Sequence, residues 1–455
     1  MKKFSSQLFW RLFPLLLLAF YPFADKLEAF LPSLQIYTSL DRYILLVLFV
    51  GVGFLMFDYL FRYTNWFAHN RFMVFGTLLL GFSFLIRVSM FGFESDDYLG
   101  NGFSDWYDFI KTNGGFSALA ENSFTTYNVP YLYVLAFLSY LPISKLIGIK
   151  LFSVLFDYLG AWAIFKILRL KTSFKISFVG TVVFLFFPTV LLNGSFWGQS
   201  DVVYTSLLLW AFYGMLLFVK SGKEVKLAGL PVLLFIMICI GLSVSYKLQA
   251  IFFALPLLLL YFKKTFNLLH VVLPLVVWFL LLIPCWLLGR SLLDLLLIYP
   301  RQFMQDAALT LDAPSVYQLF PNAPFESLHS AGLLFVLFIL AGFAWLFTSE
   351  KFKLTDETLM WVTMLSFLLF PYFLPKMHDR YFFPADVFSI VFAFWYPKKW
   401  FVPVVVGSIS FFSYIPFLFD TSVVPYSFLA IGMGLILLFL LKDFAKKFMF
   451  EVQEK

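Results

Sequence analysis

An acidic stretch, residues 91–128, holds the side chains most suited to chemistry in an otherwise apolar chain. Its charged residues, six carboxylates and one base, are Glu94, Asp96, Asp97, Asp105, Asp108, Glu121 and Lys111. The stretch follows an apolar run, and carboxylates are costly near hydrocarbon. A cluster of them at the end of a membrane helix either sits in water without a role or sets up a reaction. We expect a reaction centred on Asp97.

The segment from Glu94 to Tyr98 allows two kinds of chemistry. A carboxylate at the outer end of a helix can deprotonate a hydroxyl that lies within hydrogen-bond reach. Two adjacent carboxylates, Asp96 and Asp97, could instead hold a divalent cation through oxygen ligands. The same segment is also compatible with a solvated acidic loop.

A second polar segment runs from Trp197 to Asp201, where an apolar run emerges. Trp197 alone is uninformative, because tryptophan is common at membrane interfaces. Gln199 and Asp201, beside a glycine that permits close backbone approach, suggest a polar pocket for sugar hydroxyls. A simple polar turn would have the same composition.

Basic residues form two further groups of candidate site residues. Lys247 lies between two apolar runs and could either extend to lipid headgroups or hold a phosphate as a point charge. Lys376, His378 and Arg380 crowd five residues, and His378 and Arg380 could give a phosphate directed hydrogen bonds. Arg380 could also pair with loop charges. We expect it at the membrane surface, where its loss would leave no buried hole.

Composition indicates the class of protein that carries these residues. The chain has 455 residues, of which 62% are hydrophobic and 13% are charged, about half the charged share of a soluble domain. Apolar runs of 17 or more residues recur from end to end, and each can cross a bilayer core of ~30 Å. They lack the alternation of barrel strands. We therefore predict an all-α, polytopic membrane protein.

The remaining composition excludes several alternatives. The net charge of +7 does not indicate a nucleic-acid partner, because the bases sit in short loops beside apolar runs. The first apolar segment lacks a small-residue cleavage site, so we interpret it as a retained span rather than a signal peptide. Cys239 and Cys285 lie inside apolar runs and are interpreted as small buried hydrophobic residues.

Basic loops predict the topology. Lys2, Lys3, Arg62 and Arg71 fall on one side of the first three spans, and the positive-inside rule makes that side cytoplasmic. Segment 130–147 is short and bracketed by prolines, so we expect it to lie at the outer interface. Fourteen spans then place every basic loop inside: 8–24, 43–61, 72–90, 150–168, 176–193, 202–220, 227–245, 248–262, 268–288, 331–348, 357–374, 382–397, 401–418 and 426–443.

With this topology, nearly all segments that contain acidic or uncharged polar residues, and not only lysine and arginine, lie outside. The external segments are the acidic loop 91–128, residues 193–201, the Lys247 region, the loop 289–330 that holds Arg301, and residues 375–381. We therefore expect an outward-facing active site at the membrane surface. In a bacterium the membrane would be the cytoplasmic membrane.

Four motifs occur in an order that resembles a known superfamily. They are Ser95-Asp96-Asp97-Tyr98, Tyr127-Asn128-Val129-Pro130-Tyr131-Leu132-Tyr133, Trp197-Gly198-Gln199-Ser200-Asp201 and Met377-His378-Asp379-Arg380-Tyr381-Phe382-Phe383-Pro384. Together they resemble the bacterial GT-C superfamily of integral-membrane glycosyltransferases, and most of all its mannosyltransferase-like group. The resemblance covers about residues 72–390. It divides the chain into two additional N-terminal helices (1–71), a catalytic membrane core (72–390) and C-terminal helices with a short tail (391–455).

The resemblance implies a polyprenyl-phosphate-linked sugar donor, transfer with inversion, and interfacial helices in the first external loop. Carried over, the catalytic carboxylate is Asp97, or Asp96 if the register slips by one. Lys376, His378 and Arg380 bind the donor phosphate, helped by Lys247 or Arg301. Trp197, Gln199, Asp201 and Tyr98 line the sugar or acceptor pocket. The acceptor would be a glycan, lipid or protein, and no metal or other cofactor is predicted as required.

A transporter or flippase for a lipid-linked saccharide is the alternative function. Transporters usually carry internal repeats and ionisable residues in mid-membrane. The sequence shows no repeat, and we expect Asp157 to be the only acid deep in a helix after the acidic loop. A flippase would move lipid without forming a glycosidic bond, so an in vitro transfer assay separates the two functions.

Overall fold

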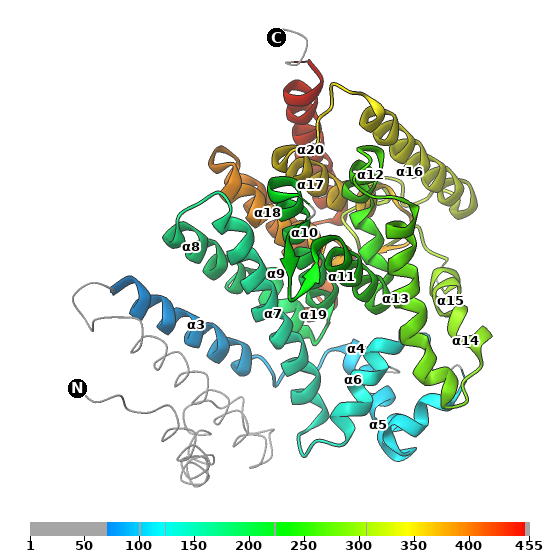
Figure 1. The fold of residues 1–455 in the computed structure, drawn as a ribbon. Helices are drawn as coiled ribbons and strands as arrows, with labels where there is room; N and C mark the ends of the chain where they lie inside the picture. Colours follow the sequence, from blue (N-terminus) through cyan, green and yellow to red (C-terminus); the bar gives the residue numbers. More distant parts are fainter. Residues whose placement is uncertain (1–70, 100–101, 123, 223, 306, 451–455) are drawn as a thin grey trace, which may run out of the picture.

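The computed structural model describes residues 71–99, 102–122, 124–222, 224–305 and 307–450, and nearly all of them are helical (Figure 1). The first half contains α3 Arg71–Ser89, α4 Asp96–Leu99, α5 Phe103–Thr112, α6 Val129–Ser139, α7 Lys145–Arg169, α8 Phe174–Leu185, α9 Pro188–Val190, α10 Asp201–Ser221, α11 Val232–Tyr246 and α12 Ala254–Phe262. The second half contains α13 Leu268–Leu287, α14 Leu292–Leu296, α15 Ile298–Met304, α16 Phe325–Thr348, α17 Asp356–Phe373, α18 Phe383–Trp395, α19 Phe401–Phe419 and α20 Tyr426–Ala445. The prediction of an all-α membrane protein is confirmed.

Short irregular elements connect these helices. Two are π-helices, Leu191–Trp197 and Lys446–Phe450, and five are 3₁₀ helices, Gly115–Ala120, Leu248–Phe253, Val316–Leu319, Asp379–Phe382 and Pro397–Lys399. In the described part of the chain, strands occur as two short pairs. Strand β1 Lys226–Leu227 pairs antiparallel with β2 Leu230–Pro231. Strand β3 Thr310–Leu311 pairs in parallel with β4 Met377–His378 and so ties two distant loops together.

Six described helices are long and apolar enough to cross a membrane. They are Lys145–Arg169, Asp201–Ser221, Leu268–Leu287, Phe325–Thr348, Pro397–Phe419 and Tyr426–Met449. The segment Phe174–Leu185 with Pro188–Trp197 is a seventh if a helix pair bent by 49° is one span. Two of the fourteen predicted spans, 8–24 and 43–61, lie outside the described residues, as does nearly all of the predicted N-terminal unit 1–71.

Several predicted spans are broken or short in the structure. The segments predicted at 227–245, 248–262 and 382–397 form α-helices of 15, 9 and 13 residues. At 1.5 Å per residue, the longest of them covers only about 22 Å, less than the ~30 Å hydrocarbon core. A total of fourteen spans and the division into three units therefore stay predictions.

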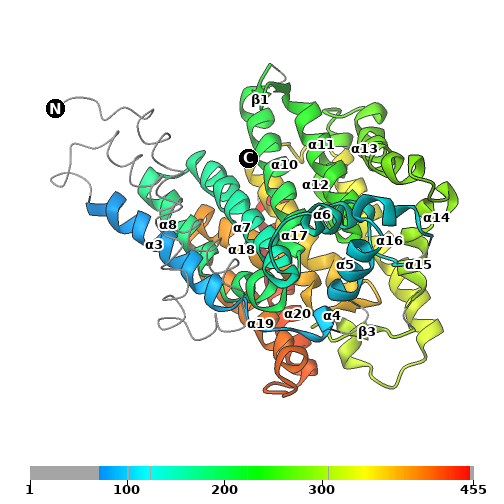
Figure 2. The same cartoon turned by 90° about the horizontal axis from the view of Figure 1, so that it is seen from below.

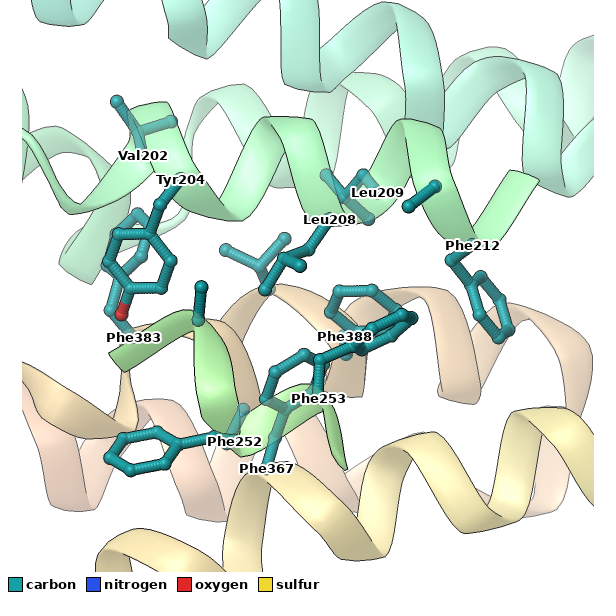
Figure 3. Packing of buried hydrophobic residues seen from close by; sticks show 14 of the residues in the cluster. Val202, Tyr204, Leu208, Leu209, Phe212, Phe252, Phe253, Phe367, Phe383 and Phe388 are labelled. Atoms are coloured by element: carbon teal, nitrogen blue, oxygen red, sulfur yellow. The ribbon is translucent and has the colours of Figure 1, made fainter. Parts of the chain in front are cut away.

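Helix α10 lies at the centre of the bundle and packs against α7, α11 and α18. Residues around its whole circumference are buried, which is typical of an interior helix. Leu208 and Phe212 of α10 face Phe253, Phe367 and Phe388 from three other segments (Figure 3). Asp201 in the first turn and Lys220 in the last complement the helix dipole.

Two charged side chains join α3 to α7 inside the protein. Arg87 Nε donates to Asp157 Oδ2 at 2.8 Å, and both side chains are fully buried. Asp157 is therefore deep in a helix, as expected, and its partner is an arginine in α3. It is not the only such acid, however. Asp386 in α18 is also fully buried, and Ser410 Oγ donates to its Oδ1 at 2.7 Å.

The short helices α4, α5 and α6 gather at one end of the bundle, beside α14 and α15 (Figures 1 and 2). Asn122 Oδ1 accepts a hydrogen bond from the Ser291 backbone, and Gln302 Nε2 donates to the Thr126 carbonyl, which joins the two regions. Helix α6 has 11 residues and so spans only about 16 Å. It is too short to cross a bilayer alone, and its placement along the interface stays a prediction.

Cysteine labelling tests this topology. Asn113 follows α5 and Lys171 follows α7, and both side chains are exposed in the protein itself. In intact cells we expect Asn113→Cys to react with an impermeant thiol reagent added outside, and Lys171→Cys to be protected until the membrane is permeabilised. The buried cysteines Cys239 and Cys285 give little background. If Lys171→Cys were labelled from outside and Asn113→Cys were not, the predicted side of the membrane would be wrong for every later loop.

Candidate functional site

A break in the helix after α8 delivers two hydrogen-bond donors to Asp97. Pro188 begins a new helical segment because it lacks a backbone N–H, and the chain continues as a π-helix to Trp197. Gly198 ends it with φ at +85°, a left-handed conformation that favours glycine. Single π-turns in helices often occur at functional sites.

Asp97 is held at one carboxylate oxygen. Trp197 Nε1–H donates to Asp97 Oδ2 at 2.8 Å, and Gln199 Nε2 donates to the same oxygen at 2.6 Å. Trp197 and Gln199 are buried, whereas the Asp97 side chain is 30% exposed. A carboxylate that is fixed in orientation and still reachable from solvent has the geometry of a general base.

Lys150, in the first turns of α7, secures the acidic loop. Its Nζ donates to the carbonyls of Phe91 at 3.1 Å, Phe93 at 2.6 Å and Phe196 at 2.8 Å, and the residue is buried. Ser95 Oγ adds a hydrogen bond to the Trp197 carbonyl at 2.8 Å. These contacts join the segment before Asp97 to the π-helix that carries its donors.

Arg380 lies among three carboxylates. Its guanidinium nitrogens are 3.9 Å from oxygens of Asp97, Asp201 and Asp379, and its Cζ is 5.5 Å from the centre of the Trp197 ring. The side chain is 15% exposed. The expectation of a surface arginine whose loss leaves no buried hole was therefore wrong, because Arg380 compensates two buried carboxylates, Asp201 and Asp379.

Asp201 and Lys247 form a buried ion pair. Lys247 Nζ donates to Asp201 Oδ1 at 2.6 Å, and Asn193 Nδ2 donates to Oδ2 at 2.9 Å. Lys247 occupies the break between α11 and the 3₁₀ helix Leu248–Phe253, where its backbone is extended. A lysine between two apolar segments thus has a carboxylate partner from another helix.

A pocket of about 540 Å³ opens beside this network. Lys247, Lys376, His378 and Arg380 line it together with aromatic rings and side-chain amides, which include Trp106, Tyr127, Tyr381, Asn128, Gln249, Gln302 and Gln305. Cations, amide groups and aromatic faces in one cavity suit a ligand that combines a phosphate with a sugar. Asp97 does not line this cavity, but it lies 3.9 Å from Arg380, which does.

Burial changes the protonation of two loop residues next to Arg380. Burial lowers the pKa of His378 well below its usual value, and the nearby charges of Arg380 and Lys247 lower it further. His378 is therefore a neutral hydrogen-bonding group rather than a third cation. Burial also raises the pKa of Asp379 to about 7, although Arg380 opposes the shift.

Three predicted site residues lie apart from this arrangement. Asp96 is exposed, next to Asp97 in α4. Tyr98 is buried in the hydrophobic core, so its ring does not face the pocket. Arg301 donates to Asp294 Oδ1 at 2.5 Å, and Asp294 also accepts from Arg290 Nε at 2.7 Å. Arg301 is thus engaged in a carboxylate-centred cluster outside the pocket wall.

Sequence reasoning missed Lys150 and Asn193, which donate hydrogen bonds to backbone carbonyls around the site and to Asp201. In the sequence, Lys150 is only the first residue of a predicted span. The signal that could have found it is a lysine inside an apolar run near the predicted outer face, because a buried ammonium group needs hydrogen-bond acceptors from the protein. In the described part of the chain, no group of three or more His, Cys, Asp or Glu side chains is arranged to hold a metal ion.

Comparison with known proteins adds no assignment: neither a family model, nor a curated protein, nor a solved structure gives a significant match to this chain.

Proposed function

We propose that the protein is a membrane glycosyltransferase that moves a sugar from a polyprenyl-phosphate-linked donor to an acceptor hydroxyl. One observation carries the proposal. A reachable carboxylate, Asp97, lies 3.9 Å from Arg380, and Arg380 also lines a cavity that contains Lys247 and Lys376. In this proposal Asp97 is the base, and the cavity beside Arg380 binds the donor phosphate.

In the proposed reaction the acceptor oxygen attacks the anomeric carbon while Asp97 takes the hydroxyl proton. The bond between that carbon and the phosphate oxygen breaks, and polyprenyl phosphate leaves with the electron pair. A single displacement of this kind inverts the anomeric configuration. Negative charge grows on the leaving phosphate, so fixed cations stabilise the transition state more than the ground state.

Lys376 is the cation best placed for the phosphate. Arg380 is surrounded by carboxylates and Lys247 is paired with Asp201, which weakens their pull on an anion. Lys376 Nζ donates to the Phe303 carbonyl at 2.8 Å and lies near the Phe303 and Phe325 rings. Its backbone is left-handed, with φ at +64°, a strained conformation for a lysine. The loop therefore fixes this side chain at the cavity.

Lys376→Gln is expected to raise the KM for the lipid donor by about ten- to a hundredfold, because one charge-assisted contact to phosphate is worth roughly 1.5–3 kcal/mol. The acceptor KM should change little. Initial rates at varied donor and fixed acceptor measure both constants. Lys111→Gln, an exposed lysine of the acidic loop outside the pocket, is the matched control. Equal donor KM values for the two variants would contradict the role of Lys376.

The proposal places the active site on the outer face of a bacterial cytoplasmic membrane and requires no cofactor. The acceptor would be a glycan, lipid or protein of the cell envelope. Mass spectrometry of envelope glycans from cells with and without the protein tests this in vivo. A missing hexose that returns with the wild-type chain, but not with Asp97→Asn, is the expected result. Unchanged glycans would contradict the proposal.

A further inference from the structure

A second polar pocket lies at the opposite end of the bundle from Asp97. It has a volume of about 660 Å³, and its wall consists of Trp361, Trp395, Tyr396, Pro397, Lys398, Lys399, Asp443, Lys446 and Lys447. The 13 residues of α18 separate the two sites, a distance of roughly 20 Å along the helix. In Figure 1 the end of α20 is at the top, and α4, α5 and α6 are at the bottom.

Lysines outnumber carboxylates at this second pocket. Lys447 pairs with Glu357 at 2.8 Å, and Lys399 pairs with Asp443. Lys398 and Lys446 are exposed at the rim, and among the described residues neither forms an ion pair. The pocket therefore carries an excess of positive charge after its internal pairs are formed.

One buried donor in the pocket wall also lacks an acceptor. Trp395 is only 3% exposed, and within the described chain its Nε1–H has no hydrogen-bond partner. A buried N–H without an acceptor is costly, so a ligand or a water must satisfy it. A ligand with oxygen acceptors and negative charge fits both this donor and the lysines.

An apolar strip leads along α20 toward this pocket. Phe428, Ile431, Leu435 and Leu438 are 67%, 46%, 62% and 63% exposed and are spaced by three or four residues, so they share one face of the helix. Lys446 lies two turns beyond Leu438 and belongs to the pocket wall. This face suits the acyl chains of a lipid whose headgroup reaches the lysines.

We infer that this pocket binds an anionic phospholipid through its phosphate, with the acyl chains along α20. Basic pockets between membrane helices commonly bind anionic headgroups. The lysines hold the phosphate, the Trp395 indole N–H donates to a headgroup oxygen, and the exposed strip of α20 contacts the chains. The site is independent of the proposed transfer reaction, because none of its residues lies near Asp97.

Native mass spectrometry and thermal unfolding of the purified full-length protein test the inference. The probes are phosphatidylglycerol or phosphatidylcholine added to the detergent micelles, and inorganic phosphate added to the buffer. We expect phosphatidylglycerol alone to remain bound and to raise the unfolding temperature. The double variant Lys398→Gln/Lys446→Gln should bind it about ten- to a hundredfold more weakly.

The matched control is Lys351→Gln/Lys353→Gln, which removes the same charge from two exposed lysines between α16 and α17, outside the pocket. It should retain wild-type binding of phosphatidylglycerol. Equal losses in both double variants, or equal binding of phosphatidylcholine by the wild type, would overturn the inference. Inorganic phosphate that stabilised the protein as strongly as phosphatidylglycerol would also overturn it, since the acyl chains would then contribute nothing.

Discussion

Asp97→Asn is expected to fold and bind lipid donor almost normally, yet lose roughly 10²- to 10⁴-fold in turnover, the usual contribution of a general base. The amide keeps the size of the side chain and its oxygen can still accept the hydrogen bonds from Trp197 and Gln199. It cannot take up the acceptor proton. The measurement is kcat at saturating donor and acceptor, with the thermal unfolding temperature recorded alongside.

Asp96→Asn is the matched control, because it makes the same chemical change one residue earlier. Asp96 is exposed, while Asp97 accepts two hydrogen bonds from the π-helix region. The structure therefore separates two carboxylates that the sequence left ambiguous, and we expect Asp96→Asn to lose much less turnover. A larger loss in Asp96→Asn would assign the base to Asp96, and full activity in both variants would remove the acidic loop from the chemistry.

Arg87→Met is expected to destabilise the protein by about 3–5 kcal/mol, because removal of one partner leaves the other charge buried and uncompensated. Arg87 and Asp157 are both fully buried and bonded at 2.8 Å. Chemical unfolding in a mild detergent measures the change as a shift in the midpoint. The residues proposed to bind the donor phosphate, Lys247, Lys376 and Arg380, lie on other segments, so the variant that remains folded should keep the wild-type donor KM.

The double variant Arg87→Met/Asp157→Leu separates a structural pair from a translocation path. An apolar pair of similar volume should recover much of the lost stability, since it needs no compensation. An enzyme should then retain transfer activity, whereas a transporter that moves charge through this pair should lose function. Normal stability of Arg87→Met alone would contradict the importance of the pair.

The class of the fold was predictable from the sequence, because a helix that crosses the hydrocarbon core must be long and apolar, and such runs are visible in the sequence. Long apolar runs such as Phe325–Thr348 form single helices where they were expected. The break at Lys247 was also expected, between the spans predicted at 227–245 and 248–262, but the α-helices on its two sides are shorter, with 15 and 9 residues. Hydropathy alone does not show that Lys247 pairs with Asp201.

The site was predictable in its residue types and less so in its contacts. Trp197, Gln199 and Arg380 do converge on Asp97, which follows from their shared position at one end of the predicted spans. The carboxylates around Arg380, the burial of Tyr98 and the pairing of Arg301 with Asp294 depend on how helices distant in sequence pack together. A charge pattern along the chain identifies the groups, but not which partner each one meets.

Product analysis with the purified protein tests the central claim most directly. Wild-type protein in lipid nanodiscs would receive a polyprenyl-phosphate hexose and an envelope-glycan acceptor, and the products would be resolved by mass spectrometry and anomeric proton NMR. The proposal predicts a new glycosidic bond of inverted configuration and one released polyprenyl phosphate for each bond formed, both lost in Asp97→Asn. Proteoliposomes in which the lipid-linked sugar crosses the bilayer, with no glycosidic bond formed in either assay, would contradict it.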